Sequence, residues 1–341
     1  MYWHSKTTKL LLAIIILISA FLLKLSVIED ISLEFVRHKP KPVTMIFGGD
    51  IMVDRGVRKS VDKNFASDYN KLFENLGLLK TFDIAFANLE GPVSDIGVDR
   101  HNLYSFRMDP GTIPALKNAG IDIVSVANNH VGDWGRDAYV DSLSRLTQAG
   151  ILFTGGGMTR SEAERPTIIE KNGIKIGFLG FSDVGPSWMD VQTDKAGLLL
   201  ASDARFAEIV EAAASQVDHL VVSFHFGDEY KPIHNKRQEY LAHRAVDHGA
   251  KIVIGHHPHV PEDTEIYSRK GCTQSSCASF IAYSLGNFIF DQSWSSPTMR
   301  GALLEIELFK DGQMSIKENV VQINKFFQSS VKEEGVKQKI F

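Results

Sequence analysis

The segment KIVIGHHPHV, residues 251–260, places three histidines within four positions directly after a short apolar run. Such a run is typical of a buried strand, and polar side chains that follow strands gather at one edge of an α/β sheet. In an extended segment side chains alternate between two faces, so we expect His257 and His259 to point to one side and His256 to the other. Pro258 restricts the backbone between them. The segment predicts a chelating pair, His257 and His259, with His256 in a supporting or structural position.

Similar groups of polar side chains follow other predicted strands, in the segments IFGGD, AFANLEGP, VSVANNHVGD, VVSFHFGDEY and YSLGNFIFD. The candidate residues in these segments are Asp50, Asn88, Glu90, Asn128, Asn129, His130, Asp133, His225, Glu229 and Asn287. Carboxylate, amide and imidazole ligands together suit a divalent ion of intermediate hardness, such as Mn²⁺, Zn²⁺ or Fe²⁺. We therefore expect these side chains to converge on a centre for one or two metal ions.

Each of these residues also has an ordinary structural interpretation. Asp50 could cap a helix, Glu90 could lie in a turn, and Asn129 could occupy a left-handed turn, as asparagine often does. His225 could be a hydrogen-bonded core histidine. Their shared position at strand ends favours the site. Four other histidines of the body are expected on helices, turns or a strand start, facing solvent: His219, His234, His243 and His248.

The order of predicted elements indicates the fold class. Short apolar strands such as VTMIFGG alternate with amphipathic helices such as RDAYVDSLSRLTQAG, and a run of strands closes the chain. Hairpins are predicted at Asn172-Gly173 and at Asp311-Gly312. This order predicts one layered α/β domain over residues 43–327, followed by a polar C-terminal tail, residues 328–341.

The N-terminus has the pattern of a membrane segment. Lys6 and Lys9 precede an apolar stretch, residues 10–28, which approaches the ~30 Å hydrocarbon thickness if Lys24 reaches the interface. The basic residues place residues 1–9 in the cytoplasm and the body on the extracytoplasmic side. A cleaved signal peptide is the alternative, although no small-x-small cleavage site follows cleanly. We expect a signal-anchor, a single pass through the cell membrane, and a juxtamembrane linker over residues 29–42.

Charge and cysteine content narrow the function classes. The net charge is −4, from 37 basic and 41 acidic residues without long blocks, and this pattern argues against a nucleic-acid partner. Cys272 and Cys277 flank a short polar loop, which favours a small disulfide in an oxidising compartment. Two reduced thiols are the alternative, and a metal site is disfavoured because no nearby pair completes four ligands.

Six segments resemble, in order and spacing, the motif series of the CapA family of poly-γ-glutamate capsule biosynthesis proteins. They are FGGDIMVDRGV, ANLEGPVSD, SVANNHVGDWG, SFHFGDEY, VIGHHPHV and YSLGNFIFD. The resemblance implies a calcineurin-like metallophosphoesterase fold, a four-layer α/β/β/α sandwich with its metal site at the strand ends. It also implies metal ligands at Asp50, Glu90, Asn129, His225, His257 and His259. By the same resemblance, His130 would contact the leaving group or scissile oxygen.

The chain departs from the family pattern at three places. Met52 stands where metallophosphoesterases usually carry the histidine of an Asp-x-His motif, so one metal position is in doubt. Phe226 replaces the usual tryptophan after the histidine of the fourth motif. The continuation VPEDTE after His259 also differs from the commoner form, which contains glutamine.

Two functions from different classes are compatible with these observations. The first is a metal-dependent hydrolase, phosphoesterase-like, in which His130 donates a proton to the leaving group and Asp133 orients it. The second is a non-catalytic subunit that binds an anionic polymer and supports membrane-bound synthase or exporter subunits. Asn88, Asn128, Glu229, His256 and Asn287 would contact substrate or support the ligands in the first case.

Overall fold

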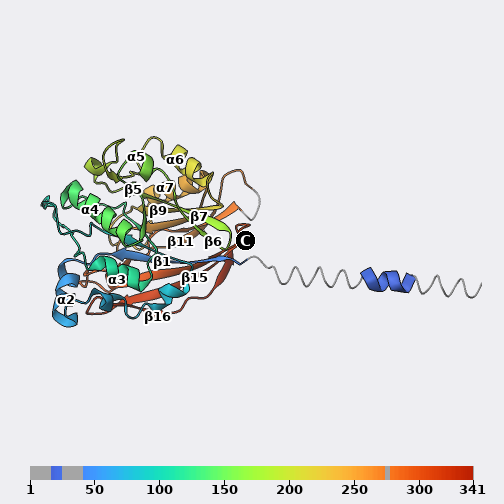
Figure 1. Ribbon diagram of the computed structural model, residues 1–341, viewed down its shortest axis with the longest axis horizontal. Coiled ribbons are helices and arrows are strands. Elements are labelled where there is room, and N and C mark those ends of the chain that lie inside the picture. Colours follow the sequence, from blue (N-terminus) through green and yellow to red (C-terminus); the bar gives the residue numbers. More distant parts are fainter. Residues whose placement is uncertain (1–16, 25–40, 273–276, 341) are drawn as a thin grey trace, which may run out of the picture. The chain divides into compact units, whose positions relative to one another are not determined.

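The computed structural model describes residues 17–24, 41–272 and 277–340 (Figure 1). The chain divides into two compact units, residues 1–41 and 42–341, and the second is called the body below. Residues 17–24 are helical. No helix within the described ranges is long and apolar enough to cross a membrane. Most of the expected anchor and linker, residues 10–28 and 29–42, and all of residues 1–9 lie outside the described residues.

A mixed sheet forms one half of the body. Its strands are β1 (Val43–Ile51), β2 (Ile84–Leu89), β3 (Ile123–Ser125), β4 (Leu152–Thr154), β13 (Asn287–Ile289), β14 (Arg300–Leu308), β15 (Met314–Ile323), β16 (Ser329–Glu333) and β17 (Gln338–Ile340). Their order is β16-β15-β14-β1-β2-β3-β4, with β13 on β1 and β17 on β15. Strands β1 to β4 are parallel, and β13 is parallel to β1.

A second mixed sheet forms the other half. Its strands are β6 (Thr167–Lys171), β7 (Ile174–Ser182), β9 (His219–His225), β10 (Ala250–His256), β11 (Thr264–Ser268) and β12 (Ala278–Ala282). Their order is β11-β12-β10-β9-β7-β6, and the central strands β7, β9, β10 and β12 are parallel. A small separate ladder pairs β5 (Gly156–Gly157) with β8 (Gly197–Leu198).

Helices connect these strands. The α-helices of the body are α2 (Arg55–Phe65), α3 (Thr112–Ala119), α4 (Gly135–Gln148), α5 (Arg160–Ala163), α6 (Phe206–Ala214) and α7 (Lys236–Asp247). Short 3₁₀ turns are η1 (Tyr69–Phe73), η2 (Gly77–Thr81), η3 (Ser187–Met189) and η5 (Pro297–Met299).

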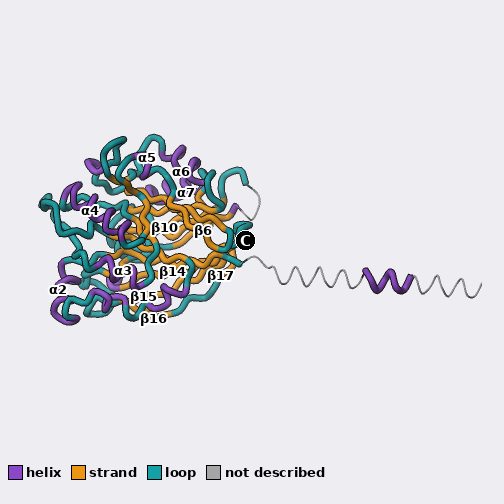
Figure 2. Tube along the Cα trace, viewed as in Figure 1, coloured by secondary structure: helices purple, strands orange, loops and turns teal. Residues whose placement is uncertain are grey.

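Three apolar clusters show how the layers pack. Alternate residues of β1 face opposite sides: Phe47 packs between the two sheets with Phe86 and Phe178, and Ile46 packs toward the helices. The outer face of the first sheet is covered by α2, α3 and α4, and that of the second by α6 and α7. Figure 2 shows the strands gathered in the middle of the body. The order of layers is therefore helices, sheet, sheet, helices, as the family resemblance implied.

Both predicted hairpins form. Asn172 and Gly173 have positive φ angles of 53° and 73° between β6 and β7, and Gly312 (φ 86°) follows Asp311 between β14 and β15. Residues 328–341 were expected to form a polar tail. In the structure β16 and β17 lie in this segment, and both pair with β15. Their sequences lack a clear apolar alternation, and only the exposed edge of β15 gives them a partner.

Candidate metal centre

The register of the first sheet brings Asp50, Asn88 and Asn287 side by side. Asp50 of β1 is paired with Asn88 of β2 on one side and with Asn287 of β13 on the other. Asn88 Nδ2 donates to Asp50 Oδ1 at 2.8 Å, and Asp50 N donates to Gly286 O at 2.9 Å. All three side chains are fully buried. A carboxylate is thus held inside the body by hydrogen bonds from neighbouring strands, and not at a helix cap.

Glu90 is a second buried carboxylate, placed just beyond β2 by a hydrogen bond from Glu90 N to Ile51 O at 2.9 Å. Burial raises the pKa of Glu90 well above its ordinary value, and the negative charges of Asp50 and Glu229 raise it further. Glu90 Oε1 is buried and has no hydrogen-bond partner among the described residues. A carboxylate in this position is stable only when protonated or when a cation lies beside it.

The two asparagines after β3 have different roles. Asn128 Nδ2 donates to Leu89 O at 2.8 Å, and Asn128 Oδ1 accepts from Gly91 N at 3.2 Å, so this side chain joins the loops after β2 and β3. Asn129 Oδ1 lies 2.9 Å from Nε2 of His225, the last residue of β9. Asn129 and His225 therefore bring the two sheets together at the site, whereas Asn128 has a structural position.

His130 and Asp133 form a hydrogen-bonded pair, with His130 Nδ1 2.7 Å from Asp133 Oδ2. Asp133 is buried and also accepts from Phe106 N at 2.8 Å and from Asn102 Nδ2 at 2.7 Å. On its other side His130 Nε2 lies 3.9 Å from Glu90 Oε1. Asp133 thus fixes the ring so that Nε2 faces the buried carboxylates.

His257 and His259 share one space, but the backbone differs from the extended segment expected. Strand β10 ends at His256, and His257 and His259 have positive φ angles of 100° and 60°. Their ring centroids are 6.0 Å apart. Two left-handed residues on either side of Pro258, and not strand alternation, bring the rings together. Such conformations cost about 1–3 kcal/mol each in non-glycine residues and occur mainly at functional sites.

His256 lies on the inner side of the site. Its Nδ1 is 3.3 Å from Asp50 Oδ1, and its ring stacks on Phe86 in the core between the sheets, with centroids 6.1 Å apart. Burial alone would raise the pKa of Asp50, but contact with His256 and the charge of His259 outweigh it and lower that pKa. His256 therefore favours the ionised form of Asp50, and its ring is buried.

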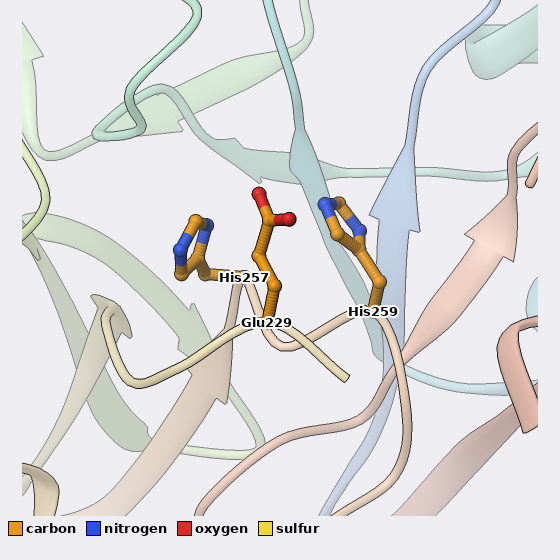
Figure 3. Close-up of side chains that lie close together, drawn as sticks. All are labelled: Glu229, His257 and His259. Carbon is orange, nitrogen blue, oxygen red and sulfur yellow. The ribbon is translucent and has the colours of Figure 1, made fainter. Parts of the chain in front are cut away.

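Glu229, His257 and His259 point into the same space from two loops (Figure 3). One ligand atom of each lies within 4.8 Å of the others. The same holds for Asp50, Glu90 and His259. His259 is common to both groups and is held by Asn287, whose Oδ1 lies 3.0 Å from His259 Nδ1. The geometry therefore offers two adjacent ligand groups that meet at one imidazole.

The protonation states of the histidines suit metal ligation. Burial lowers the pKa of His257 and of His259 to about 4, and burial lowers that of His225 well below its ordinary value. All three rings are therefore neutral near pH 7, with lone pairs available to a cation. His257 Nδ1, like Glu90 Oε1, is buried without a hydrogen-bond partner in the described part of the chain. A divalent cation in each ligand group would give Glu90 and His257 a partner and offset the repulsion between Asp50 and Glu90, so the residues present fit such ions.

The structure explains one departure from the family pattern. Met52, at the position where a histidine is usual, is fully buried and packs with Phe106 and Phe290. Its sulfur accepts from Asp54 N at 3.2 Å. This side chain therefore forms part of an apolar wall and offers no imidazole to the ion.

Two neighbours of the site were missed by sequence reasoning. The ring centroids of Phe106 and His130 are 3.9 Å apart. The central guanidinium carbon of Arg55 lies 4.6 Å from the centroid of the Phe106 ring. Arg55 has a positive φ of 47° and pairs with Asp291. The DRG run after the first strand was the only signal for Arg55, and Phe106 lies in a loop without periodicity.

Outside the site, Cys272 and Cys277 are joined by a disulfide. The expectation that the remaining histidines face solvent is wrong for His219, which is 9% exposed and whose Nε2 lies 2.9 Å from Phe309 O. Its position at the first residue of β9 is covered by the β14–β15 hairpin, a contact between segments distant in sequence.

Comparisons with known proteins agree with the motif resemblance. The model of the family described as "Bacterial capsule synthesis protein PGA_cap" matches residues 44–292. "PGA biosynthesis protein CapA" of Bacillus subtilis (strain 168) is 31% identical over 300 residues, which cover 86% of this chain and 75% of that protein. "Capsule biosynthesis protein CapA" of Bacillus anthracis is 31% identical over 301 residues, which cover 85% and 69%.

Solved structures resemble the chain more distantly. Calcineurin-like phosphoesterase YfkN from Bacillus subtilis aligns at a TM-score of 0.40 and 14% identity, over 88% of this chain and 91% of that chain. The NAD nucleotidase of Haemophilus influenzae aligns at a TM-score of 0.47 and 11% identity, over 85% and 53%. The family match and the two CapA relatives confirm the resemblance drawn from the motifs: the chain belongs to the bacterial capsule synthesis protein family PGA_cap.

Proposed function

We propose that this protein is a membrane-anchored, extracytoplasmic, metal-dependent hydrolase of phosphoesterase type that acts in the synthesis or export of poly-γ-glutamate. One observation carries the catalytic part: two buried carboxylates, Asp50 and Glu90, share a site with three neutral imidazoles and with the His130–Asp133 pair. A structural metal site needs the ligands but has no use for an oriented histidine beside them.

The ligand geometry supports a site for one or two divalent ions. Asp50, Glu90 and His259 would hold one ion. Glu229 and His257 would hold a second together with the shared His259, and Asn129 and His225 lie beside them. A divalent ion, when bound, supplies a Lewis acid that polarises a substrate oxygen.

The chain itself supplies the proton transfer. Asp133 accepts a hydrogen bond from His130 Nδ1 and stabilises the positive charge when the ring is doubly protonated. Nε2 then holds the proton that the leaving oxygen or nitrogen takes up as its bond to the substrate breaks. The Phe106 ring against His130 excludes water from one face and keeps the ring from turning away. Candidate bonds are a phosphoester, or an amide or ester in a γ-glutamyl or glycan polymer.

Other observations support the polymer, the membrane anchor and the partners named in this proposal. The CapA relatives are named for the biosynthesis of PGA and of capsule, which supports poly-γ-glutamate as the polymer and membrane-bound synthase or exporter subunits as partners. The apolar stretch over residues 10–28 supports a single-pass anchor. The Cys272–Cys277 disulfide supports an oxidising, extracytoplasmic location.

The proposal is tested in a strain that depends on this protein for polymer production. Asp50→Ala combined with His259→Ala should abolish production as completely as deletion of the gene, while the variant protein remains present in the membrane. Purified wild-type protein should also hydrolyse a phosphodiester or the polymer in a metal-dependent manner. Polymer production that survives in the double variant, but not in the deletion strain, would establish the non-catalytic assembly function instead.

A further inference from the structure

The rim of the candidate site beside His130 carries two arginines arranged around one tryptophan. The Trp188 indole lies against the backbone of the loop that holds His130 and Asp133, since a Cβ at Gly132 would be 2.6 Å from Trp188 Cζ2. Arg100 and Arg136 lie over this ring, 4.8 Å and 5.6 Å from its centroid. We call Arg100, Arg136 and Trp188 the arginine–tryptophan rim.

Hydrogen bonds tie this rim to the proton-transfer pair. Arg100 N donates to Asp133 O at 2.8 Å, and Asp133 holds His130. Arg136 Nη2 donates to Trp188 O at 2.7 Å. These contacts place the rim against the loop that carries His130 and Asp133.

The described residues leave the charges of the rim without an ion-pair partner. Six of the other described arginines lie within 4.0 Å of a carboxylate: Arg55, Arg58, Arg145, Arg160, Arg205 and Arg237. Arg107, Arg165, Arg244, Arg269 and Arg300 do not, so the distinguishing feature of Arg100 and Arg136 is that both lie over one ring beside the site. In the described part of the chain, no carboxylate lies that close to Arg100 or Arg136. Asp99 is adjacent in sequence, but its carboxylate accepts from Ser105 Oγ and His101 N within its own loop.

The rim also has an unused donor. Arg136 Nη1 is buried and lacks a hydrogen-bond partner among the residues described. Trp188 is 42% exposed and Arg100 is exposed as well, so this side of the rim is open to a ligand. Both guanidinium groups lie over the same indole, so two positive charges are gathered around one ring. A guanidinium pair of this kind binds carboxylates in a planar, bidentate manner.

We propose that the arginine–tryptophan rim docks the carboxylates of the anionic polymer and holds the segment that flanks the bond presented to His130. This inference rests on the proposed function, because it takes poly-γ-glutamate as the polymer. Such a polymer carries one free carboxylate on each unit, so a segment that passes His130 would place successive carboxylates along the rim. The rim would therefore act in specificity, while the metal ligands and His130 act at the bond.

The test measures binding of poly-γ-glutamate of defined length, and of a single N-acetylglutamate unit, to the purified full-length protein. Arg100→Gln combined with Arg136→Gln should raise the Kd for the polymer about tenfold or more and reduce its dependence on salt. Metal content and the hydrolysis of a small phosphodiester should stay at the wild-type level. Arg100→Lys combined with Arg136→Lys keeps the charge but loses bidentate geometry, and it should restore part of the affinity.

Arg244→Gln is the matched control. Arg244 also lies over an aromatic ring, that of Phe206, but on α7 on the outer face of the second sheet. This variant should bind the polymer as the wild type does. If the wild type binds and the double glutamine variant binds within about twofold of it, the rim has no docking role. If the wild type itself binds no polymer, the proposed polymer function fails, and the docking role fails with it.

Discussion

Asp133 Oδ2 lies 2.7 Å from His130 Nδ1, and the backbone N–H of Phe106 donates to the same carboxylate oxygen at 2.8 Å. The carboxylate is therefore fixed before any substrate arrives, and the imidazole is fixed with it. Pre-organisation of this kind lowers the barrier because no reorientation is needed during proton transfer.

Replacing Asp133 by Asn should lower kcat/KM for a phosphodiester by about a hundredfold, because the amide no longer stabilises the charged ring. Metal content should not change. His130→Ala should lose a similar factor, and the double variant should lose little more than His130→Ala alone, since the two residues act as a unit. Asp137→Asn, the same change at an exposed position of α4, serves as the control. Losses that multiply in the double variant would show that the pair does not act together.

The sequence predicted which residues meet, because parallel strands deliver their following residues to one edge. Asp50 lies in β1, His225 ends β9, and His259 follows β10, so residues from two different sheets share the site. The backbone of His257 and His259 could not be predicted, since positive φ at a non-glycine residue depends on contacts such as the hydrogen bond from Tyr230 N to Pro258 O.

The loop residue beside His130 could not be predicted from the sequence for a related reason. Phe106 reaches His130 through a loop whose course is determined by hydrogen bonds to Asp133 and Asp54. No periodic pattern marks such a residue. The pairing of β16 and β17 with β15 likewise depends on a free sheet edge that only the assembled fold creates.

Close backbone approach at Gly255 supports the histidine segment. A Cβ at this position would lie 1.8 Å from Tyr283 O and 2.6 Å from Phe226 Cε1. Gly255→Ala should therefore lower the free energy of unfolding by about 3 kcal/mol or more and reduce metal content, because the following histidines must shift. At Gly77 an added Cβ would meet nothing within 4 Å, so Gly77→Ala should change the free energy of unfolding by less than about 0.5 kcal/mol. Urea denaturation of both variants gives the comparison, and equal effects would contradict the packing argument.

Glu262 should make stability depend on pH. Burial raises the pKa of Glu262 to about 7, although the hydrogen bond from Gln238 acts to lower it. Glu262 Oε1 is buried and has no hydrogen-bond partner among the described residues. The folded state therefore binds a proton that the unfolded state has already released between about pH 4.5 and about pH 7. The free energy of unfolding should fall as pH rises through this window and stay lower above it.

Glu262→Gln should remove this part of the pH dependence of the free energy of unfolding, because an amide does not titrate. Denaturant titrations at about pH 5 and about pH 8 should show a smaller difference for the variant than for the wild type. Glu208→Gln, an exposed carboxylate on α6, is the control and should keep the wild-type difference. An unchanged pH dependence in Glu262→Gln would show that Glu262 is ionised in the folded protein at both pH values.

Metal content of the purified full-length protein tests the central claim most directly. The wild type should contain one or two divalent ions per chain, and His257→Ala combined with His259→Ala should contain almost none, because His259 belongs to both ligand groups. His248→Ala, a histidine that pairs with Glu211 on the surface, should keep the wild-type content. Elemental analysis after dialysis against Mn²⁺, Zn²⁺ and Fe²⁺ in turn makes the measurement. Equal metal content in the wild type and the double alanine variant, or none in either, would contradict a metal centre at the ends of these strands.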